Sequence, residues 1–315
     1  MARPLRVVSF GECMLELQGE AFGTMRQGFG GDTLNTAVYL ARCARPGRLS
    51  VSYATALGDD PLSDGLRQRW HDEGLQTSLV RRLPGRLPGL YLIEVDAAGE
   101  RRFNYWRERS AAREYFDTAA GDTPLEREAE HIDALHFSGI SLAILPPQGA
   151  ERLLALAARL RERGALVAFD NNYRPRLWPD ADRARELFGR ALAACSLALL
   201  TLDDEQALWG GEAAEAQLAA TLAHPCPEIV VKRGALPTLV RCGSTPAREV
   251  PTVPGVKVVD STAAGDAFAG GYLAARLGGG SAVQAAAAGN LVAARVVQHR
   301  GALIPRELMA DLMGS

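Results

Sequence analysis

The stretch Val258-Val259-Asp260-Ser261-Thr262-Ala263-Ala264-Gly265-Asp266-Ala267-Phe268 decides how the other segments of the chain are interpreted. Two β-branched residues lead into an acid, a run of small residues follows, and a second acid precedes a helical run from Ala267 to Arg276. We expect a strand that breaks into a tight turn and enters a helix, which leaves backbone N–H groups free at the helix N-terminus. Such a turn binds anions, and phosphate is the usual ligand.

Asp266 lies at the mouth of this turn, and two interpretations of it remain open. A carboxylate beside a phosphate site repels the phosphate, so it makes chemical sense there only if it takes a proton from a neighbouring hydroxyl. In that case Asp266 is a general base, and Ala263, Ala264 and Gly265 form an anion hole for a phosphoryl group in transfer. In the second interpretation Asp266 only caps the helix, a common role for aspartate.

Apolar, strand-like runs alternate with helical segments along most of the chain. The strands are expected at 5–10, 51–56, 131–137, 166–170, 197–202 and 228–231, and the helices at 33–44, 62–73, 148–163, 183–194, 214–222 and 282–297. This alternation predicts an α/β fold with a mostly parallel sheet. Polar residues follow several of the apolar strands, and the carboxyl ends of parallel strands line a binding crevice.

One part of the chain departs from the alternation of strand and helix. Gly89–Asp96 and Arg101–Arg107 flank a four-residue turn, which predicts an antiparallel hairpin. Together with the segments near Met14 and Phe29, this hairpin is expected to form a small β-sheet lid over the core. The chain is thus one domain, 1–315, with a lid made of about 12–30 and 86–110.

Composition and missing motifs argue against several classes of function. The net charge of −2 over 315 residues gives no reason to expect nucleic acid or an anionic membrane as partner. Five scattered cysteines without a CxxC pair, a start without a leader-like apolar region and no membrane-length apolar run predict a cytoplasmic protein. The histidines show no metal-ligand spacing. No P-loop pattern, no GxSxG pattern and no dinucleotide-binding GxGxxG after the first strand occurs.

Several polar stretches have two interpretations each when they are taken alone. The Gly30-Gly31-Asp32…Asn35 stretch fits a simple helix start, or backbone approach to a polyhydroxy ligand with Asp32 and Asn35 on its hydroxyls. Tyr91, Tyr105 and Arg107 fit exposed cross-strand neighbours. Surface charge is one interpretation of Arg174 and Arg176 and of Lys232-Arg233-Gly234. The other interpretation is that Arg174 pairs with a carboxylate or phosphate and that Lys232-Arg233-Gly234 contacts a nucleotide.

Two distant stretches resemble the signatures of one family. Asp260–Asp266 resembles the second signature of the ribokinase-like (PfkB) carbohydrate kinases, and Gly30–Asn35 resembles the first. Two motifs in the right order are far more specific than either alone. Further segments resemble one subgroup, the 2-keto-3-deoxygluconate kinases: Gly11–Met14, Phe29–Thr36, Arg86–Tyr91, Phe103–Arg107, Phe169–Trp178, Thr201–Glu205, Ala207–Gly210 and Arg300–Pro305. The resemblance covers nearly the whole chain.

The resemblance implies a three-layer α/β core with a β lid, and ATP- and magnesium-dependent phosphorylation of the terminal hydroxyl of a keto-deoxy sugar acid. Asp266 matches the catalytic base, and Ala263, Ala264 and Gly265 match the anion hole. The implied sugar site, completed by Asp266, comprises Gly30, Gly31, Asp32, Asn35, Tyr91, Tyr105, Arg107 and Arg174. The implied ATP site comprises Asn172, Arg174, Thr201, Lys232, Arg233, Gly234, Ala263, Gly265 and Asn290.

The chain departs from the family pattern at both phosphate motifs. Ser261 and Ala263 replace a Thr and a Gly of the second signature. Thr201-Leu202-Asp203-Asp204 replaces Asn-x-x-Glu, so Asp204 is the expected, indirect, magnesium partner. A neutral-sugar kinase such as a fructokinase, a nucleoside kinase and a catalytically silent sugar-binding relative remain alternatives. We expect a homo-oligomer, because exposed lid strands offer edges for pairing between subunits.

Overall fold

The structure is a computed structural model and describes residues 3–20, 22–95, 101–118, 121–210 and 213–313. Its large sheet contains nine strands among these residues, in the order β13-β12-β11-β10-β9-β8-β1-β4-β5. The strands are β1 Leu5–Phe10, β4 Leu49–Leu57, β5 Val80–Arg82, β8 Ala134–Ser138, β9 Leu166–Asp170, β10 Leu197–Thr201, β11 Glu228–Arg233, β12 Leu236–Cys242 and β13 Arg248–Val250. All pairs are parallel except β11 with β12 and β12 with β13.

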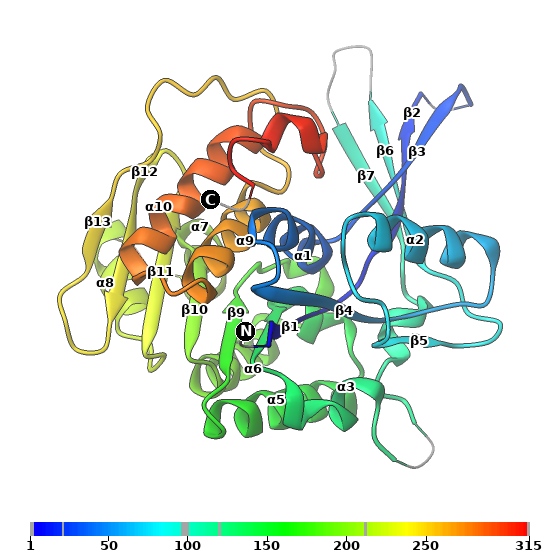
Figure 1. The fold of residues 1–315 in the computed structure, drawn as a ribbon, viewed down its shortest axis with the longest axis horizontal. Helices are drawn as coiled ribbons and strands as arrows, with labels where there is room; N and C mark the ends of the chain where they lie inside the picture. Colours follow the sequence, from blue (N-terminus) through cyan, green and yellow to red (C-terminus); the bar gives the residue numbers. More distant parts are fainter. Residues whose placement is uncertain (1–2, 21, 96–100, 119–120, 211–212, 314–315) are drawn as a thin grey trace.

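Helices cover both faces of this sheet, as the strand sequences require. The central strands are apolar at consecutive positions: Val167 and Phe169 of β9 belong to one hydrophobic cluster, and Ala168 between them belongs to the other. Because successive side chains of a strand point to opposite faces, such a strand is stable only between two helical layers. The predicted three-layer α/β class is confirmed (Figure 1).

One helical layer packs against the cluster that contains Ala168. It consists of α1 Asp32–Cys43, α2 Pro61–Asp72, α9 Ala264–Leu277 and α10 Ala282–Val296. The opposite layer is formed by α3 Pro124–Arg127, α4 Gly139–Ile144, α5 Pro147–Glu162, α6 Ala181–Ala194, α7 Leu202–Trp209 and α8 Ala214–Leu222. No helix among the described residues is long and apolar enough to cross a membrane.

Helices α1 and α9 pack closely along their lengths, which sets their N-termini side by side at one end of the sheet. Gly270 of α9 permits this approach, because a Cβ there would lie 2.8 Å from the backbone nitrogen of Leu40 in α1. The predicted helices agree with the observed ones to within a few residues.

A second sheet of four described strands stands apart from the core, beside α2 in Figure 1. We call it the small sheet: β2 Met14–Gly19, β3 Met25–Gly30, β6 Gly89–Val95 and β7 Arg101–Trp106, in the order β3-β2-β6-β7. The predicted hairpin is present as antiparallel β6 and β7, with Tyr91 opposite Tyr105. Its turn, 97–100, lies outside the described residues.

The prediction of a strand at Val258-Val259 is wrong. This segment has no strand structure, and its two valine side chains are largely exposed. The backbone nitrogens of Val259 and Asp260 donate instead to the carbonyl oxygen of Val297, at 2.8 and 3.1 Å. The segment is therefore held by the end of α10 rather than by a sheet, and β-branched residues alone do not supply the strand partner that a β-strand needs.

Candidate active site

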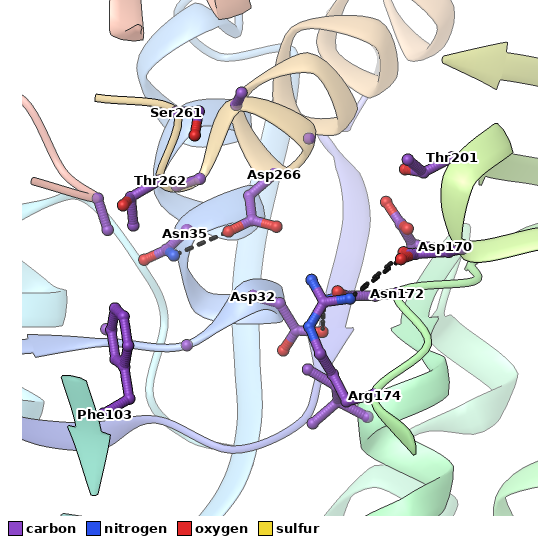
Figure 2. A pocket seen from close by; sticks show the side chains of 18 of the residues that line it. Asp32, Asn35, Phe103, Asp170, Asn172, Arg174, Thr201, Ser261, Thr262 and Asp266 are labelled. Carbon is purple, nitrogen blue, oxygen red and sulfur yellow. Dashed lines mark hydrogen bonds and ion pairs between the residues drawn. The ribbon is translucent and has the colours of Figure 1, made fainter. Parts of the chain in front are cut away.

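A cavity of about 430 Å³ lies between the carboxyl edge of the large sheet, the N-termini of α1 and α9, and the inner face of the small sheet. Figure 2 shows that its acidic and amide side chains, from segments far apart in sequence, converge on one space. The lining residues are Met14, Gly30, Gly31, Asp32, Asn35, Tyr91, Phe103, Tyr105, Ile140, Asp170, Asn172, Arg174, Thr201, Asp203, Asp204, Lys232, Ser261, Thr262, Ala263, Ala264, Gly265, Asp266 and Ala302.

Asp266 lies in the first turn of α9 and faces this cavity (Figure 2). Burial raises the pKa of Asp266 to about 7, and the nearby Asp32 carboxylate adds to the rise. Asn35 opposes it by donating from Nδ2 to Asp266 Oδ2 at 2.9 Å. An aspartate whose pKa lies near neutrality can accept a proton from an alcohol and release it again, as a general base does.

The turn before α9 places backbone N–H groups next to this carboxylate. Asp260 stabilises the turn by accepting from the Thr262 nitrogen at 3.0 Å, from Thr262 Oγ1 at 2.7 Å and from the Gly301 nitrogen at 3.0 Å. Ala263 then adopts a left-handed conformation, with φ of 60°, and directs the chain into the helix. The first amides of a helix have no acceptor within it and can bind an anion. That of Ala264 donates to the Ser261 carbonyl at 3.2 Å, so Ala263 and Gly265, which line the cavity, are the candidate anion ligands of this turn.

The N-terminus of α1 supplies the second polar wall. Asp32, the first residue of α1, accepts from Asn172 Nδ2 at 2.8 Å, which joins this helix to the segment after β9. Asn35 Oδ1 is buried and has no hydrogen-bond partner within the described structure. An amide oxygen that is buried without a partner is costly, and a ligand hydroxyl would satisfy it.

A buried ion pair lies beside the α9 turn. Lys232, at the end of β11, donates from Nζ to Asp170 Oδ2 at 2.8 Å, and the exposed fractions of the two side chains are 11% and 9%. A Cβ at Gly265 would lie 3.4 Å from Lys232 Nζ, so this ammonium group is close to the proposed anion hole. The Lys232 charge can therefore act on the same anion as the helix amides.

Arg174 and Asp204 form a more exposed pair that also lines the cavity. Arg174 Nη1 donates to Asp204 Oδ1 at 3.2 Å, and half of the Arg174 side chain, 52%, is exposed. Burial raises the pKa of Asp204, and the Arg174 charge opposes that rise. Nearby, Asn171 joins β9 to β10 by donating to the Thr201 carbonyl and accepting from the Thr201 nitrogen, both at 3.0 Å.

The inner face of the small sheet forms an aromatic wall. The rings of Tyr91 and Tyr105 lie 6.0 Å apart, and those of Phe103 and Tyr105 lie 6.4 Å apart and nearly parallel. Tyr91 donates its hydroxyl to Glu16, and burial together with that carboxylate raises the pKa of Tyr91. Aromatic rings with hydroxyl groups suit a ligand that has both C–H faces and hydroxyls.

Four residues that the sequence placed in the site do not line the cavity. Arg107 is buried and forms an ion pair with Glu12. Asn290 accepts from Thr238 Oγ1 at 2.9 Å and donates to the Pro251 carbonyl at 3.0 Å, so it ties α10 to the sheet edge. Arg233 bonds the Pro237 carbonyl and Glu249, and Gly234 forms the turn between β11 and β12.

Other lining residues were not predicted. The most consequential is Asp170, whose position as the last residue of a buried strand was the signal that could have identified it. Phe103 shares a face with Tyr105 by alternation along β7. The rest are Met14, Ile140, Asp203, Ser261, Thr262 and Ala302, whose approach to the cavity depends on the tertiary fold.

The donor set indicates how a magnesium ion would be held. Within the described part of the chain, no group of three or more His, Cys, Asp or Glu side chains is arranged to hold a metal by itself. Asp203 and Asp204 nevertheless line the cavity. Mg²⁺ commonly binds one or two carboxylates, several waters and the phosphates of a nucleotide. These residues fit an ion that arrives with a nucleotide and meets Asp204 directly or through water.

Comparisons with known proteins agree with this geometry. The model of the pfkB family carbohydrate kinases matches residues 5–308. The 2-dehydro-3-deoxygluconokinase of Escherichia coli K12 is 48% identical over 96% of this chain and 98% of that protein. That of Haemophilus influenzae is 38% identical over 98% of both chains. A crystal structure of a PfkB protein from Polaromonas sp. JS666 superposes with a TM-score of 0.80 at 26% identity, covering 97% of this chain and 99% of that one. The chain therefore belongs to the pfkB family of carbohydrate kinases.

Proposed function

We propose that the enzyme transfers the γ-phosphoryl group of ATP to the terminal hydroxyl of 2-keto-3-deoxygluconate, giving 2-keto-3-deoxy-6-phosphogluconate and ADP. The similarity to relatives named 2-dehydro-3-deoxygluconokinase, at 38% and 48% identity over nearly the full chain, supports this substrate. The observation that carries the chemistry is Asp266, a partly buried carboxylate with a pKa of about 7 at the N-terminus of α9.

Asp266 and the α9 turn divide the reaction between them. Asp266 accepts the proton of the terminal hydroxyl, so that this oxygen can attack phosphorus in line with the leaving ADP. The amides of Ala263 and Gly265, joined by that of Ala264 once it leaves the Ser261 carbonyl, stabilise the charge on the transferred group, and Lys232 adds a cation beside them. Magnesium, bound with ATP near Asp204, would neutralise phosphate charge.

The sugar acid would lie between α1 and the small sheet. Asp32 and the unpartnered Asn35 Oδ1 would take its hydroxyls, and Gly30 and Gly31 allow close approach of the backbone. Tyr91 and Tyr105 would cover it from the small sheet. Arg174, which is half exposed at the cavity, is the cation best placed for the carboxylate. Arg107 would serve the substrate only after leaving Glu12.

ATP would occupy the other half of the cavity. This arrangement is supported by Asn172, Thr201, Lys232 and Arg174, which lie at or just after the carboxyl ends of β9, β10 and β11. The contacts of Asn290 with Thr238 and Pro251 engage both ends of its amide, so we assign Asn290 no direct role with ATP. Arg233 and Gly234 would approach the nucleotide only from outside the cavity.

The small sheet would act as the lid of a single kinase domain, with 12–30 and 86–110 as its two segments. Exposed apolar side chains at its base, including Leu87 and Trp106, support pairing of two copies through these strands. Light scattering tests this; a monomer at micromolar concentration would contradict it. Five free thiols support a reducing location, and we propose the cytoplasm.

A coupled assay with ATP and a panel of acceptors tests the proposed function. The panel is 2-keto-3-deoxygluconate, 2-keto-3-deoxygalactonate, fructose, ribose and adenosine. We expect the highest kcat/KM for a keto-deoxy sugar acid. A preference for fructose would favour the fructokinase alternative, to which the placement of Arg107 outside the cavity lends some support. Sugar binding without turnover would indicate a catalytically silent relative.

A further inference from the structure

The small sheet joins the core at four strand ends: the start of β2 near Met14, the end of β3 at Gly30, the start of β6 at Gly89 and the end of β7 at Trp106. The arrangement of these four ends sets the angle of the small sheet over the cavity. Glu12 lies between β1 and β2, two residues before β2 begins at Met14. Only 2% of Glu12 is exposed.

Glu12 contacts the other three strand ends. Its Oε2 accepts from Arg107 Nη2, directly after β7. Its Oε1 lies against Gly89, where a Cβ would come within 2.8 Å of it. Its backbone carbonyl oxygen lies against Gly31, directly after β3, where a Cβ would come within 2.1 Å. Any side chain at Gly31 or Gly89 would force these contacts apart. The four strand ends and Glu12, which we call the junction, are therefore packed around Glu12.

The ion pair in this junction is buried and incompletely satisfied. The exposed fractions of the Arg107 and Glu12 side chains are 9% and 1%. Glu12 Oε1, Arg107 Nε and the nearby Ser110 Oγ are buried and have no hydrogen-bond partner within the described structure. Removing either member leaves the other charge buried and unpaired, so the junction depends on both.

We infer that Glu12 is a positioning residue for the sugar site: through Arg107 it holds the small sheet at the angle that brings Met14, Tyr91, Phe103 and Tyr105 onto the cavity. This inference rests on the proposed kinase function but not on the identity of the sugar. Glu12 itself does not line the cavity. It acts on the sugar half of the site, because the residues it positions come from the small sheet, whereas the ATP half is built from β9, β10 and β11.

The test begins with Glu12→Gln, which keeps the shape of the side chain and removes its charge. With the best sugar of the acceptor panel, we expect the KM for sugar to rise at least tenfold and the KM for ATP to change less than twofold. We also expect more ATP to be hydrolysed per sugar phosphorylated, because a loose sheet excludes water less well. Unchanged sugar KM and unchanged coupling would overturn the inference.

Glu126→Gln is the matched control. Glu126 pairs with Arg152 on the opposite helical layer, and 12% of its side chain is exposed. Both variants lose an ion pair, so both can lower the thermal midpoint. Only Glu12→Gln is expected to change the KM for sugar. An equal change in both variants would assign the effect to general destabilisation and overturn the inference.

Arg107→Met and the double variant separate positioning from direct binding of the substrate carboxylate. If Arg107 acts through Glu12, the two single variants and the double variant lose sugar affinity to a similar extent, because all three break one interaction. If Arg107 instead binds the carboxylate directly, Glu12→Gln frees it. Glu12→Gln would then bind the acid sugar as well as the wild type or better, which would overturn the inference.

Hydrogen exchange gives a readout that does not depend on activity. In Glu12→Gln we expect faster amide exchange at 14–19, 25–30, 89–95 and 101–106, with β1, β8 and β9 unchanged. If the wild-type enzyme phosphorylates no sugar of the panel, the proposed function fails while this measurement still tests the junction. Unchanged exchange in the small sheet would overturn the inference in either case.

Discussion

Asp266→Asn should remove the proposed general base while keeping the hydrogen bond that holds this side chain in place. The amide keeps the size of the side chain and can still accept from Asn35 Nδ2, which donates at 2.9 Å. It cannot take a proton from the acceptor hydroxyl. General base catalysis contributes about 10²–10⁴ in rate, so kcat should fall by about two to four orders of magnitude with the KM for sugar little changed.

The same substitution should make the protein more stable, with a defined pH dependence. The Asp266 pKa rises from 3.8 to about 7 on folding, so the folded state favours the protonated acid. The contribution of Asp266 to the free energy of unfolding of the wild type is therefore greatest below about pH 4. It falls as the pH rises to 7 and is constant above that pH. Three pKa units correspond to about 4 kcal/mol, which is an upper bound on the gain in Asp266→Asn above pH 7.

Two measurements check these expectations. The wild-type kcat/KM should rise about tenfold per pH unit below 7 and level off above it, because the ionised fraction of Asp266 does so. Urea unfolding of wild type and Asp266→Asn should give nearly equal free energies at pH 4 and a clear difference at pH 8. Retained turnover in the variant would refute the base assignment. A stability difference that does not vary with pH would refute the account of its pKa.

Three further substitutions test individual features. Ala263→Gly should stabilise the protein by up to about 1 kcal/mol in urea unfolding, because the φ of 60° is costly for alanine and not for glycine. As the control, Ala275→Gly within α9 should destabilise the protein by a similar amount. Lys232→Met should raise the KM for ATP and cost about 3 kcal/mol of stability, and adding Asp170→Asn should recover stability without activity. Tyr105→Ala should raise the KM for sugar while the thermal midpoint stays the same, since 44% of Tyr105 is exposed.

Much of the fold could be predicted because its determinants are local in sequence. Consecutive apolar residues in β9 and β10 required two covering layers, and the helical spacing of Leu153, Leu156 and Leu160 in α5 identified a face for one of them. The hairpin of β6 and β7 followed from alternation around a short turn. Val258-Val259 was the exception, because a strand also requires a neighbour and that neighbour is not encoded locally.

Most of the residues that the sequence named for the site line the cavity, and four of them do not. Short motifs named Asp266, Asp32 and Asn35, because a helix N-terminus with an acid or amide can be recognised within six residues. Arg107 and Asn290 have the right residue types for ligands, yet Glu12 and Thr238 occupy their polar groups. Those partners are 95 and 52 positions away in sequence, beyond any local pattern.

By itself, the sequence determined the strand–helix alternation, the tight turn before α9 and the acid at its mouth. Only the tertiary structure decided that Asp266 is more than a cap: the packing of α1 against α9 brings Asp32 and Asn35 to it, and burial raises its pKa to about 7. The physical reason is that backbone conformation and hydrophobic pattern depend on neighbouring residues, whereas desolvation and charge coupling depend on what the fold brings into contact.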